Sequence, residues 1–353
     1  MASFSAALKL KEQLSRQMLK KKGVHGIGVG LNNPRNPKSG AAVIVYTDKA
    51  FTAHTNKKLH MTVTTKGKKL AVPVIYKKTS RFRLHAKATE DLTGRIRPVV
   101  AGYSVGTPNV SGTAGLIVRS RSGNQKYILS NNHVLNATNS SKYSVTIQPG
   151  GADGGTSPKD RVGHLDRFVK ISSTRPNFMD AATSIPTRNS LLSPTYAQIG
   201  VIPGYVTSYR VGDKFKKVGR TTGLVNGTVD SIHTDVQISY EGYADLSVVT
   251  FKDQTVVKGS SPVSLPGDSG SVWLTRQGNY AAAVNYAGSS DGRLSIAYPI
   301  RWFMQRFSTE VARPSGTGTV KTIKIPAKDK NKYIRSLTAE QLKQIKLVRA
   351  KRK

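Results

Sequence analysis

A serine, a histidine and an aspartate in three separate motifs could together carry out nucleophilic chemistry. Ser269 lies in the segment SLPGDSGSVWL, directly after Asp268 and between two glycines. Serine, glycine and aspartate are also the commonest turn residues, so this motif alone does not distinguish a nucleophile from a turn hydroxyl. A nucleophilic serine needs a base to take its proton, an acid to orient that base, and amide donors for the oxyanion.

The candidate base is His133 in KYILSNNHVLNAT. It comes just after the apolar segment 126–130, whose composition predicts a strand that could hold the imidazole rigidly. The alternative is an ordinary turn histidine, since the chain has 7 histidines.

The candidate acid is Asp180 in RPNFMDAATSIPT, where an apolar residue precedes it and small residues follow. We expect this carboxylate to be partly buried, which is costly without a partner, and a histidine N–H is a natural partner. The alternative is a turn aspartate that caps the next segment.

The oxyanion donors would be the backbone N–H groups of Gly267 and Ser269, and Gly270 leaves room behind the serine. The chain order His133, Asp180, Ser269 is that of chymotrypsin-like enzymes, whereas subtilisin-like enzymes run Asp, His, Ser. The α/β-hydrolase motif G-x-S-x-G is excluded because Ser271 stands at its last position.

Strands must position most of these residues. Residues 4–22 have the pattern of an amphipathic helix, and strand-like segments rich in Val, Ile, Thr and Tyr follow between turn signals. Near the C-terminus, Thr338 and Gln341 have the spacing of a helix capping box. We therefore expect a mostly β chain in four parts: an amphipathic helix (1–23), a small strand-rich N-terminal unit (24–97), a β domain (98–308), and a linker with a basic helical tail (309–353).

Several motifs resemble those of chymotrypsin-fold serine peptidases. ILSNNHVL, DAA and PGDSGS resemble their histidine, aspartate and serine motifs, and FKKVGRTTGLVNGTV resembles the strand pair that opens the second barrel in bacterial trypsin-like members. The resemblance covers about residues 24–308. It is greatest to intracellular bacterial members that carry an N-terminal strand-rich unit, and it does not include the basic tail.

This resemblance implies two antiparallel six-stranded β-barrels with an active site between them, and an endopeptidase that hydrolyses polypeptides through an acyl-enzyme. His133 would come from the first barrel, Asp180 from the junction, and Ser269 with the oxyanion amides from the second. His133 would act first as general base and then as acid, Asp180 would fix its tautomer, and Asp268 would shape the oxyanion loop. By position, Val263 would form the floor of the specificity pocket, with Asn285 and Tyr286 in one wall. Since no acidic residue stands at that floor, we expect an apolar or small P1 residue rather than Lys or Arg.

The charge of the chain suggests a second class of function. Lys and Arg number 55 against 19 Asp and Glu, a net charge of +36 that attracts polyanions such as nucleic acid. No helix-turn-helix, RNA-recognition or zinc-finger signature accompanies it, which argues against reading of base sequence. The alternative function is therefore a protease-fold binding or structural protein on nucleic acid or a large assembly. Both functions can hold in one molecule, and solubility alone would also account for the charge.

Composition excludes other classes. The absence of cysteine rules out disulfides and thiolate sites. Without an H-E-x-x-H motif or a close histidine pair, we expect no metal and no other cofactor. No apolar run approaches the roughly 18 residues of a membrane span. With no secretory pattern at the N-terminus, we expect a cytoplasmic protein, and a place in a viral particle stays open.

Overall fold

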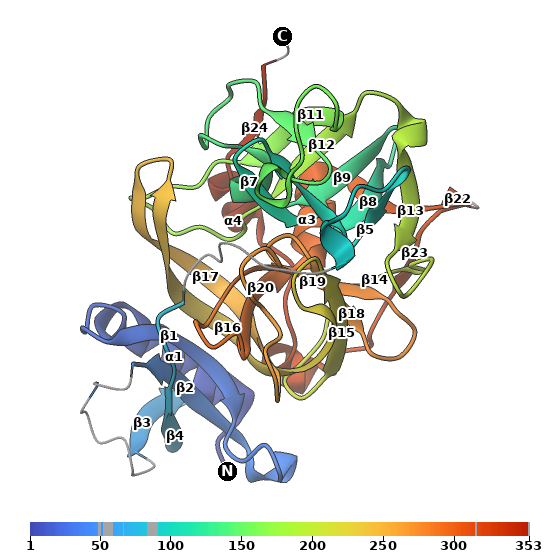
Figure 1. Cartoon of the computed structure of the whole chain (residues 1–353). Coiled ribbons are helices and arrows are strands. Elements are labelled where there is room, and N and C mark those ends of the chain that lie inside the picture. The colour runs from blue at the N-terminus through green and yellow to red at the C-terminus, as the bar shows by residue number, and fades with distance from the viewer. Residues whose placement is uncertain (49–50, 52–58, 66, 83–90, 315, 352–353) are drawn as a thin grey trace.

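The computed structural model describes residues 1–48, 51, 59–65, 67–82, 91–314 and 316–351. Strands dominate it, so the mostly β class is confirmed. Figure 1 shows two strand-rich bodies, one above the other, with the N-terminal elements beside the lower one. His54 and His85, two of the 7 histidines, lie outside the described residues. Within the described ranges no helix is both long and apolar enough to span a membrane.

Six strands of the lower body close on themselves. They pair in the order β15-β18-β19-β20-β17-β16, and β15 also pairs with β16, so the ring is complete. Its strands carry fully buried aromatic residues such as Trp273 and Tyr286, which belong to two separate apolar clusters. The strands are β15 (Lys214–Gly219), β16 (Gly223–Tyr243), β17 (Leu246–Lys258), β18 (Val272–Thr275), β19 (Ala281–Gly288) and β20 (Leu294–Pro299).

The upper body is a second, mainly antiparallel sheet with the order β22-β21-β8-β9-β12-β11-β10-β6-β7, and β24 pairs with β11. A short helix, α2 (Asn132–Leu135), follows β9 directly. The strands are β6 (Ser104–Thr107), β7 (Val110–Thr113), β8 (Leu116–Ser120), β9 (Lys126–Ser130), β10 (Val145–Ile147), β11 (Arg161–Val169), β12 (Ala182–Pro186), β21 (Thr309–Arg313), β22 (Gly316–Thr317) and β24 (Leu347–Arg349). Beside it, β5 (Val99–Ala101) and β13 (Leu192–Tyr196) form a two-stranded parallel sheet.

The N-terminal elements extend the sheet of the lower body. β1 pairs antiparallel with β16, with Gly26 opposite Val236, and α1 packs over the strands through apolar residues such as Leu10. The helix ends at Met18 rather than at residue 22, because the chain turns through three consecutive lysines to Gly23, which has a φ of +84°. The elements are α1 (Phe4–Met18), β1 (Val24–Leu31), β2 (Ala41–Thr47), β3 (Leu59–Thr65) and β4 (Lys68–Lys78).

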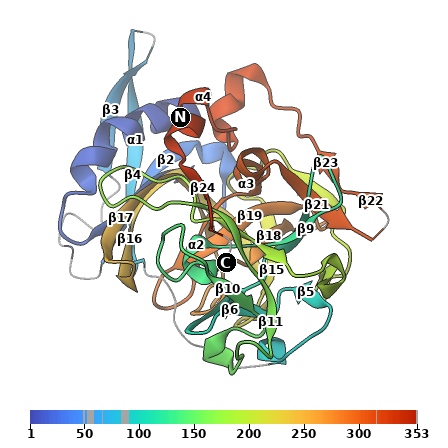
Figure 2. The ribbon, with the colours of Figure 1, turned by 90° about the horizontal axis from the view of Figure 1, so that it is seen from above.

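The C-terminal residues fold back over both bodies, as the red segment in Figure 2 shows. After α3 (Ile300–Phe307), the chain forms β21, and then β23 (Thr319–Lys321) pairs with β14 (Gly204–Val206). The 3-10 helix η5 (Ala327–Lys332) follows, and its Asn331 hydrogen-bonds Ser5 of α1 at 3.4 Å.

The predicted capping box of the last helix is present, since the Thr338 hydroxyl and the Gln341 side chain each accept from the other residue's backbone N–H. The helix itself, α4 (Ala339–Gln344), is much shorter than the expected one. It ends because Ile345 is buried and its carbonyl accepts hydrogen bonds from the Arg306 guanidinium. The chain then continues as β24 on the edge of β11.

Candidate active site

The structure brings His133 and Asp180 into direct contact. His133 lies in α2, just after β9, and Asp180 precedes β12. These two strands pair with Ala182 opposite Ser130, which places the two side chains next to each other. His133 Nδ1 lies 2.5 Å from Asp180 Oδ2. Both side chains are buried, so the expected burial of the carboxylate and its pairing with a histidine are both present.

Four donors surround the Asp180 carboxylate. Oδ1 accepts from the backbone N–H of Asn132 at 2.6 Å and of His133 at 3.3 Å. Oδ2 accepts from His133 Nδ1 and from the Tyr240 hydroxyl, the latter at 2.7 Å. Because the carboxylate is an acceptor, Nδ1 carries the proton and Nε2 presents its lone pair. Among the described residues, Nε2 has no hydrogen-bond partner.

Ser269 lies on a loop that packs against the segment leading to His133. The Thr113 N–H donates to the Ser269 carbonyl at 2.8 Å. A side chain at Gly270 would collide with Ser130 Oγ, three positions before the histidine. A Cβ at Gly112 would lie 2.5 Å from a methyl of Val134 and 2.9 Å from the Ser269 carbonyl oxygen. Glycines thus allow the two backbones to approach closely. In this arrangement the Ser269 hydroxyl donates to the Tyr286 carbonyl at 3.3 Å.

Hydrogen bonds fix the orientation of the peptides before and at Ser269. The Pro266 carbonyl accepts from the Thr221 hydroxyl, and the Asp268 carbonyl accepts from Ser271 N–H and from Asn285 Nδ2, both at 3.0 Å. In a trans peptide the N–H points away from the carbonyl. The N–H groups of the following residues, 267 and 269, therefore point away from these tethered carbonyls. Gly267 has a φ of +92°, which a side chain would strain.

Asp268 forms an ion pair that the sequence did not predict. Lys217 Nζ on β15 lies 3.3 Å from Asp268 Oδ2, and both side chains are completely buried. The carboxylate also accepts from the backbone N–H groups of Thr221, Thr222 and Leu265. Burial lowers the pKa of Lys217, while the Asp268 charge opposes this shift. The segment KFKKVG holds several lysines in a predicted strand. Nothing in the sequence distinguishes the buried Lys217 from its more exposed neighbours.

Arg220 is a second buried cation beside the oxyanion loop. Its guanidinium lies 3.2 Å from Asp153, and the Arg220 side chain is 1% exposed. A Cβ at Gly267 would collide with this guanidinium, so only glycine fits there. The Thr113 hydroxyl accepts a hydrogen bond from the Arg220 backbone N–H and donates one to the Gly267 carbonyl. The loop is thereby tied to the upper body.

The structure places the three predicted pocket residues in the interior. Val263 joins the apolar cluster around Trp273. The Asn285 side chain bonds Ser264 and Ser295 as well as the Asp268 carbonyl, so its polar atoms serve the fold. The Tyr286 ring packs 4.9 Å from that of Phe251, and only its backbone carbonyl meets Ser269. Position in the chain did not reveal where these side chains point.

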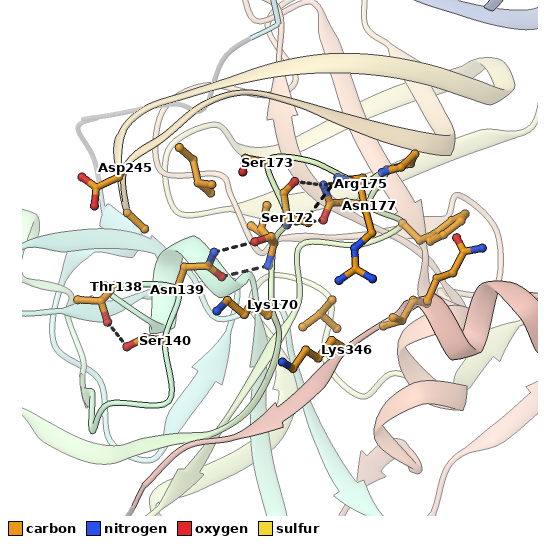
Figure 3. Close-up of a pocket in the computed structure, with 18 residues that line it drawn as sticks. Thr138, Asn139, Ser140, Lys170, Ser172, Ser173, Arg175, Asn177, Asp245 and Lys346 are labelled. Atoms are coloured by element: carbon orange, nitrogen blue, oxygen red, sulfur yellow. Dashed lines mark hydrogen bonds between the residues drawn. The ribbon is translucent and has the colours of Figure 1, made fainter. Parts of the chain in front are cut away.

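A cavity of about 760 Å³ lies beside the segments that flank His133 and Asp180 (Figure 3). Its walls come from residues 138–140, 169–173, 175–178, 244–246 and 344–346. Asn139 closes one wall by bonding the backbone of Ile171 through both its amide atoms. Neither His133, Asp180 nor Ser269 lines this cavity.

Comparisons with known proteins give similarity in structure only. No protein-family model and no curated protein sequence matches the chain. Among solved structures, a glutamic acid specific serine protease is 19% identical with a TM-score of 0.45, over 61% of this chain and 100% of its own. Protease A of Thermobifida fusca is 20% identical with a TM-score of 0.44, over 62% and 99%. Nocardiopsis protease is 17% identical with a TM-score of 0.44, over 61% and 99%.

Proposed function

We propose that the protein is a serine endopeptidase of the chymotrypsin type, with Ser269 as nucleophile. The observation that carries this proposal is the buried His133–Asp180 pair, with a lone pair on Nε2 and the Ser269 loop packed against the same segment. A buried imidazole held by a carboxylate, with a serine on a glycine-rich loop that packs against the same segment, is an arrangement suited to acyl transfer.

In the first half of the proposed reaction, Ser269 Oγ attacks the carbonyl carbon of the scissile peptide and its proton passes to His133 Nε2. The oxyanion that forms accepts hydrogen bonds from the N–H groups of Gly267 and Ser269. The C–N bond then breaks, and the imidazolium gives its proton to the leaving amine. In the second half, a water loses its proton to Nε2 and attacks the ester. Ser269 Oγ leaves and regains a proton from His133.

Asp180 would hold His133 in the tautomer with the proton on Nδ1 and stabilise the imidazolium. The carboxylate is suited to this role because two backbone N–H groups hold its Oδ1, so that it cannot easily turn away from the imidazole.

Lys217 would let the oxyanion loop form without processing of the chain. In secreted relatives the aspartate before the serine meets a newly released N-terminal amine, and here the ammonium of Lys217 lies at 3.3 Å from Asp268. We therefore propose that the chain is active as synthesised. For P1, the preference for an apolar or small residue expected from the sequence remains a prediction.

The test is labelling with a fluorophosphonate probe. Folded wild type should be labelled at Ser269, Ser269→Ala should not, and His133→Ala should be labelled far more slowly. Cleavage of a proteome-derived peptide library, compared between wild type and Ser269→Ala, would then give the P1 preference. A wild type that neither labels nor cleaves, in a sample whose fold is verified by near-UV circular dichroism, would refute the proposal.

Polyanion binding is a second proposal, compatible with the first, and the net charge of +36 supports it. Binding through phosphate neutralisation must weaken steeply with salt, since counterions are released on binding. Titration of the Ser269→Ala protein with a fluorescent single-stranded RNA and a DNA duplex, at several salt concentrations, tests it. An absent or salt-insensitive interaction would count against this role.

A further inference from the structure

The Tyr240 hydroxyl donates to the same oxygen of Asp180 that contacts His133. We propose that Tyr240 is a positioning residue that orients the Asp180–His133 pair. This inference rests on the proposed peptidase function, because it gives Tyr240 a part in the same site. None of the motifs in the sequence pointed to it, since QISYEGY has the composition of an ordinary strand end.

The geometry distinguishes Tyr240 from a tyrosine that merely fills space. Its hydroxyl lies 2.7 Å from Asp180 Oδ2, while His133 Nδ1 lies 2.5 Å from the same atom. The two backbone donors hold Oδ1. Tyr240 is thus the one side-chain donor besides the histidine among the described hydrogen bonds of this carboxylate, and its loss would leave Oδ2 tethered to His133 alone.

The Tyr240 ring also restrains the imidazole. It stands edge-on to the His133 ring, with centroids 6.1 Å apart and planes at 87°. Tyr243 adds a similar contact at 6.3 Å and 77°. The Tyr243 hydroxyl donates to the Asn136 carbonyl at 2.9 Å, which fastens this end of β16 to the segment after the histidine. Both tyrosines therefore define the space in which the imidazole can turn.

Tyr240 stays protonated, and is therefore a lasting donor. Burial raises the pKa of Tyr240 well above its usual value, and the negative charge of Asp180 raises it further. The same two causes raise the pKa of Tyr243, and the pKa values of the buried Tyr286 and Tyr298 rise likewise. Within the part of the chain that the structure describes, the titratable groups found to interact with Asp180 are His133 and these neutral phenols.

The bond links the two bodies of the molecule. Tyr240 belongs to β16 of the closed ring, whereas Asp180 precedes β12 of the upper sheet. The hydroxyl therefore transmits the relative placement of the bodies to the base. If they shift apart, the carboxylate loses a donor and gains freedom to rotate.

The experiment compares Tyr240→Phe with Tyr209→Phe. Tyr209 is buried in the apolar cluster around Trp273, and its hydroxyl makes a 2.7 Å bond to Thr255, so this control loses a buried hydroxyl bond away from the site. A hydrogen bond to a charged group is worth about a tenfold change or more in rate when it acts in the transition state. We expect Tyr240→Phe to slow fluorophosphonate labelling of Ser269 about tenfold, and Tyr209→Phe to leave the rate near that of wild type.

Two further readouts separate positioning from a purely structural effect. Without the Tyr240 hydrogen bond, the Asp180 charge stabilises the imidazolium more strongly. The fall of the labelling rate towards acid pH should therefore begin at a higher pH in Tyr240→Phe. The NMR resonance of the His133 Nδ1 proton should shift in Tyr240→Phe and not in Tyr209→Phe. This shift needs no turnover, so it tests the inference even if wild type fails to label. If Tyr240→Phe and Tyr209→Phe have the same labelling rate, the same pH dependence of that rate and the same resonance of the His133 Nδ1 proton, Tyr240 has no positioning role.

Discussion

Lys217 and Asp268 form an ion pair in which neither side chain reaches solvent. A charge pair without exposure is stable only if its remaining polar atoms are satisfied, and three backbone N–H groups complete the Asp268 shell. Because Asp268 directly precedes Ser269, this pair holds the loop that we propose to bind the oxyanion.

Substitution of Lys217 by Met should disable the site. Removing one partner of a buried pair costs about 3–5 kcal/mol, because the other charge stays buried without compensation. We expect a lower urea midpoint and at least tenfold slower labelling of Ser269. Lys214→Met, an exposed lysine on the same strand whose ammonium bonds only Thr228 in the described hydrogen bonds, is the control and should change neither. Recovery of stability in Lys217→Met/Asp268→Asn would identify the unpaired charge as the cause.

Gly270→Ala should disrupt the contact between the Ser269 loop and the His133 segment. The new methyl group would overlap Ser130 Oγ and the Thr113 carbonyl. The matched control is Gly212→Ala, because Gly212 has the same φ of +94° with no atom within 4 Å of its Cβ position. Both variants carry the backbone strain of about 1–2 kcal/mol, and only Gly270→Ala carries the clash. Equal midpoints in urea for the two variants would contradict the packing described here.

Asp253 should make the free energy of unfolding depend on pH in the acid range. Burial alone would raise the pKa of Asp253, but the hydrogen bond and charge of His233, with Lys11 nearby, hold it below its usual value. An acid whose folded pKa is depressed stabilises the fold above its unfolded pKa, and this contribution is lost as the pH falls towards the folded value. Asp253→Asn should therefore be less stable than wild type by about 1–3 kcal/mol at pH 7, with the gap closing below about pH 4.

Urea unfolding at pH 7 and at pH 3.5 measures this gap. Asp245→Asn serves as control, because Asp245 is exposed and shares the left-handed backbone of Asp253, with φ values of +55° and +58°. A gap between wild type and Asp253→Asn that stays constant with pH would show that the carboxylate charge is not the source.

Lys11 should anchor α1 to the hairpin of β16 and β17. Its ammonium lies 2.8 Å from Asp235, and the two side chains are 3% and 5% exposed. The Ser15 hydroxyl also donates to this carboxylate at 2.6 Å. Lys11→Met should cost about 3–5 kcal/mol in urea unfolding, whereas the exposed Lys9→Met should cost under about 1 kcal/mol. A small effect at Lys11 would mean that the helix is held by its apolar face alone.

Local patterns predicted much of this structure. The strand before His133 occupies residues 126–130 as expected, and the capping box at Thr338 is present. The expected contact between His133 and Asp180 also exists. The strand and the cap succeed because each is encoded within a few neighbouring residues, whereas the His133–Asp180 contact was expected from the order of the motifs and their resemblance to a known family. The reaction itself remains a prediction.

Contacts between distant segments were not predictable in the same way. Tyr240 and Lys217 lie in segments that read as ordinary strands, and their partners depend on how the strands are placed. The helix expected to reach the C-terminus stops at Gln344, because burial of Ile345 and pairing with β11 outweigh local helix propensity.

The pairing of β1 with β16 bears on the solubility of the protein. β15 covers one edge of β16 at residues 223–228, and β1 pairs with residues 232–236 farther along the strand. An uncovered strand edge is a template for pairing with other chains, and Ile232 and Val236 would make this one apolar. A form lacking residues 1–78 would therefore expose an unpaired apolar strand edge and be prone to self-association. We expect the N-terminal strands to keep this edge from pairing with other chains.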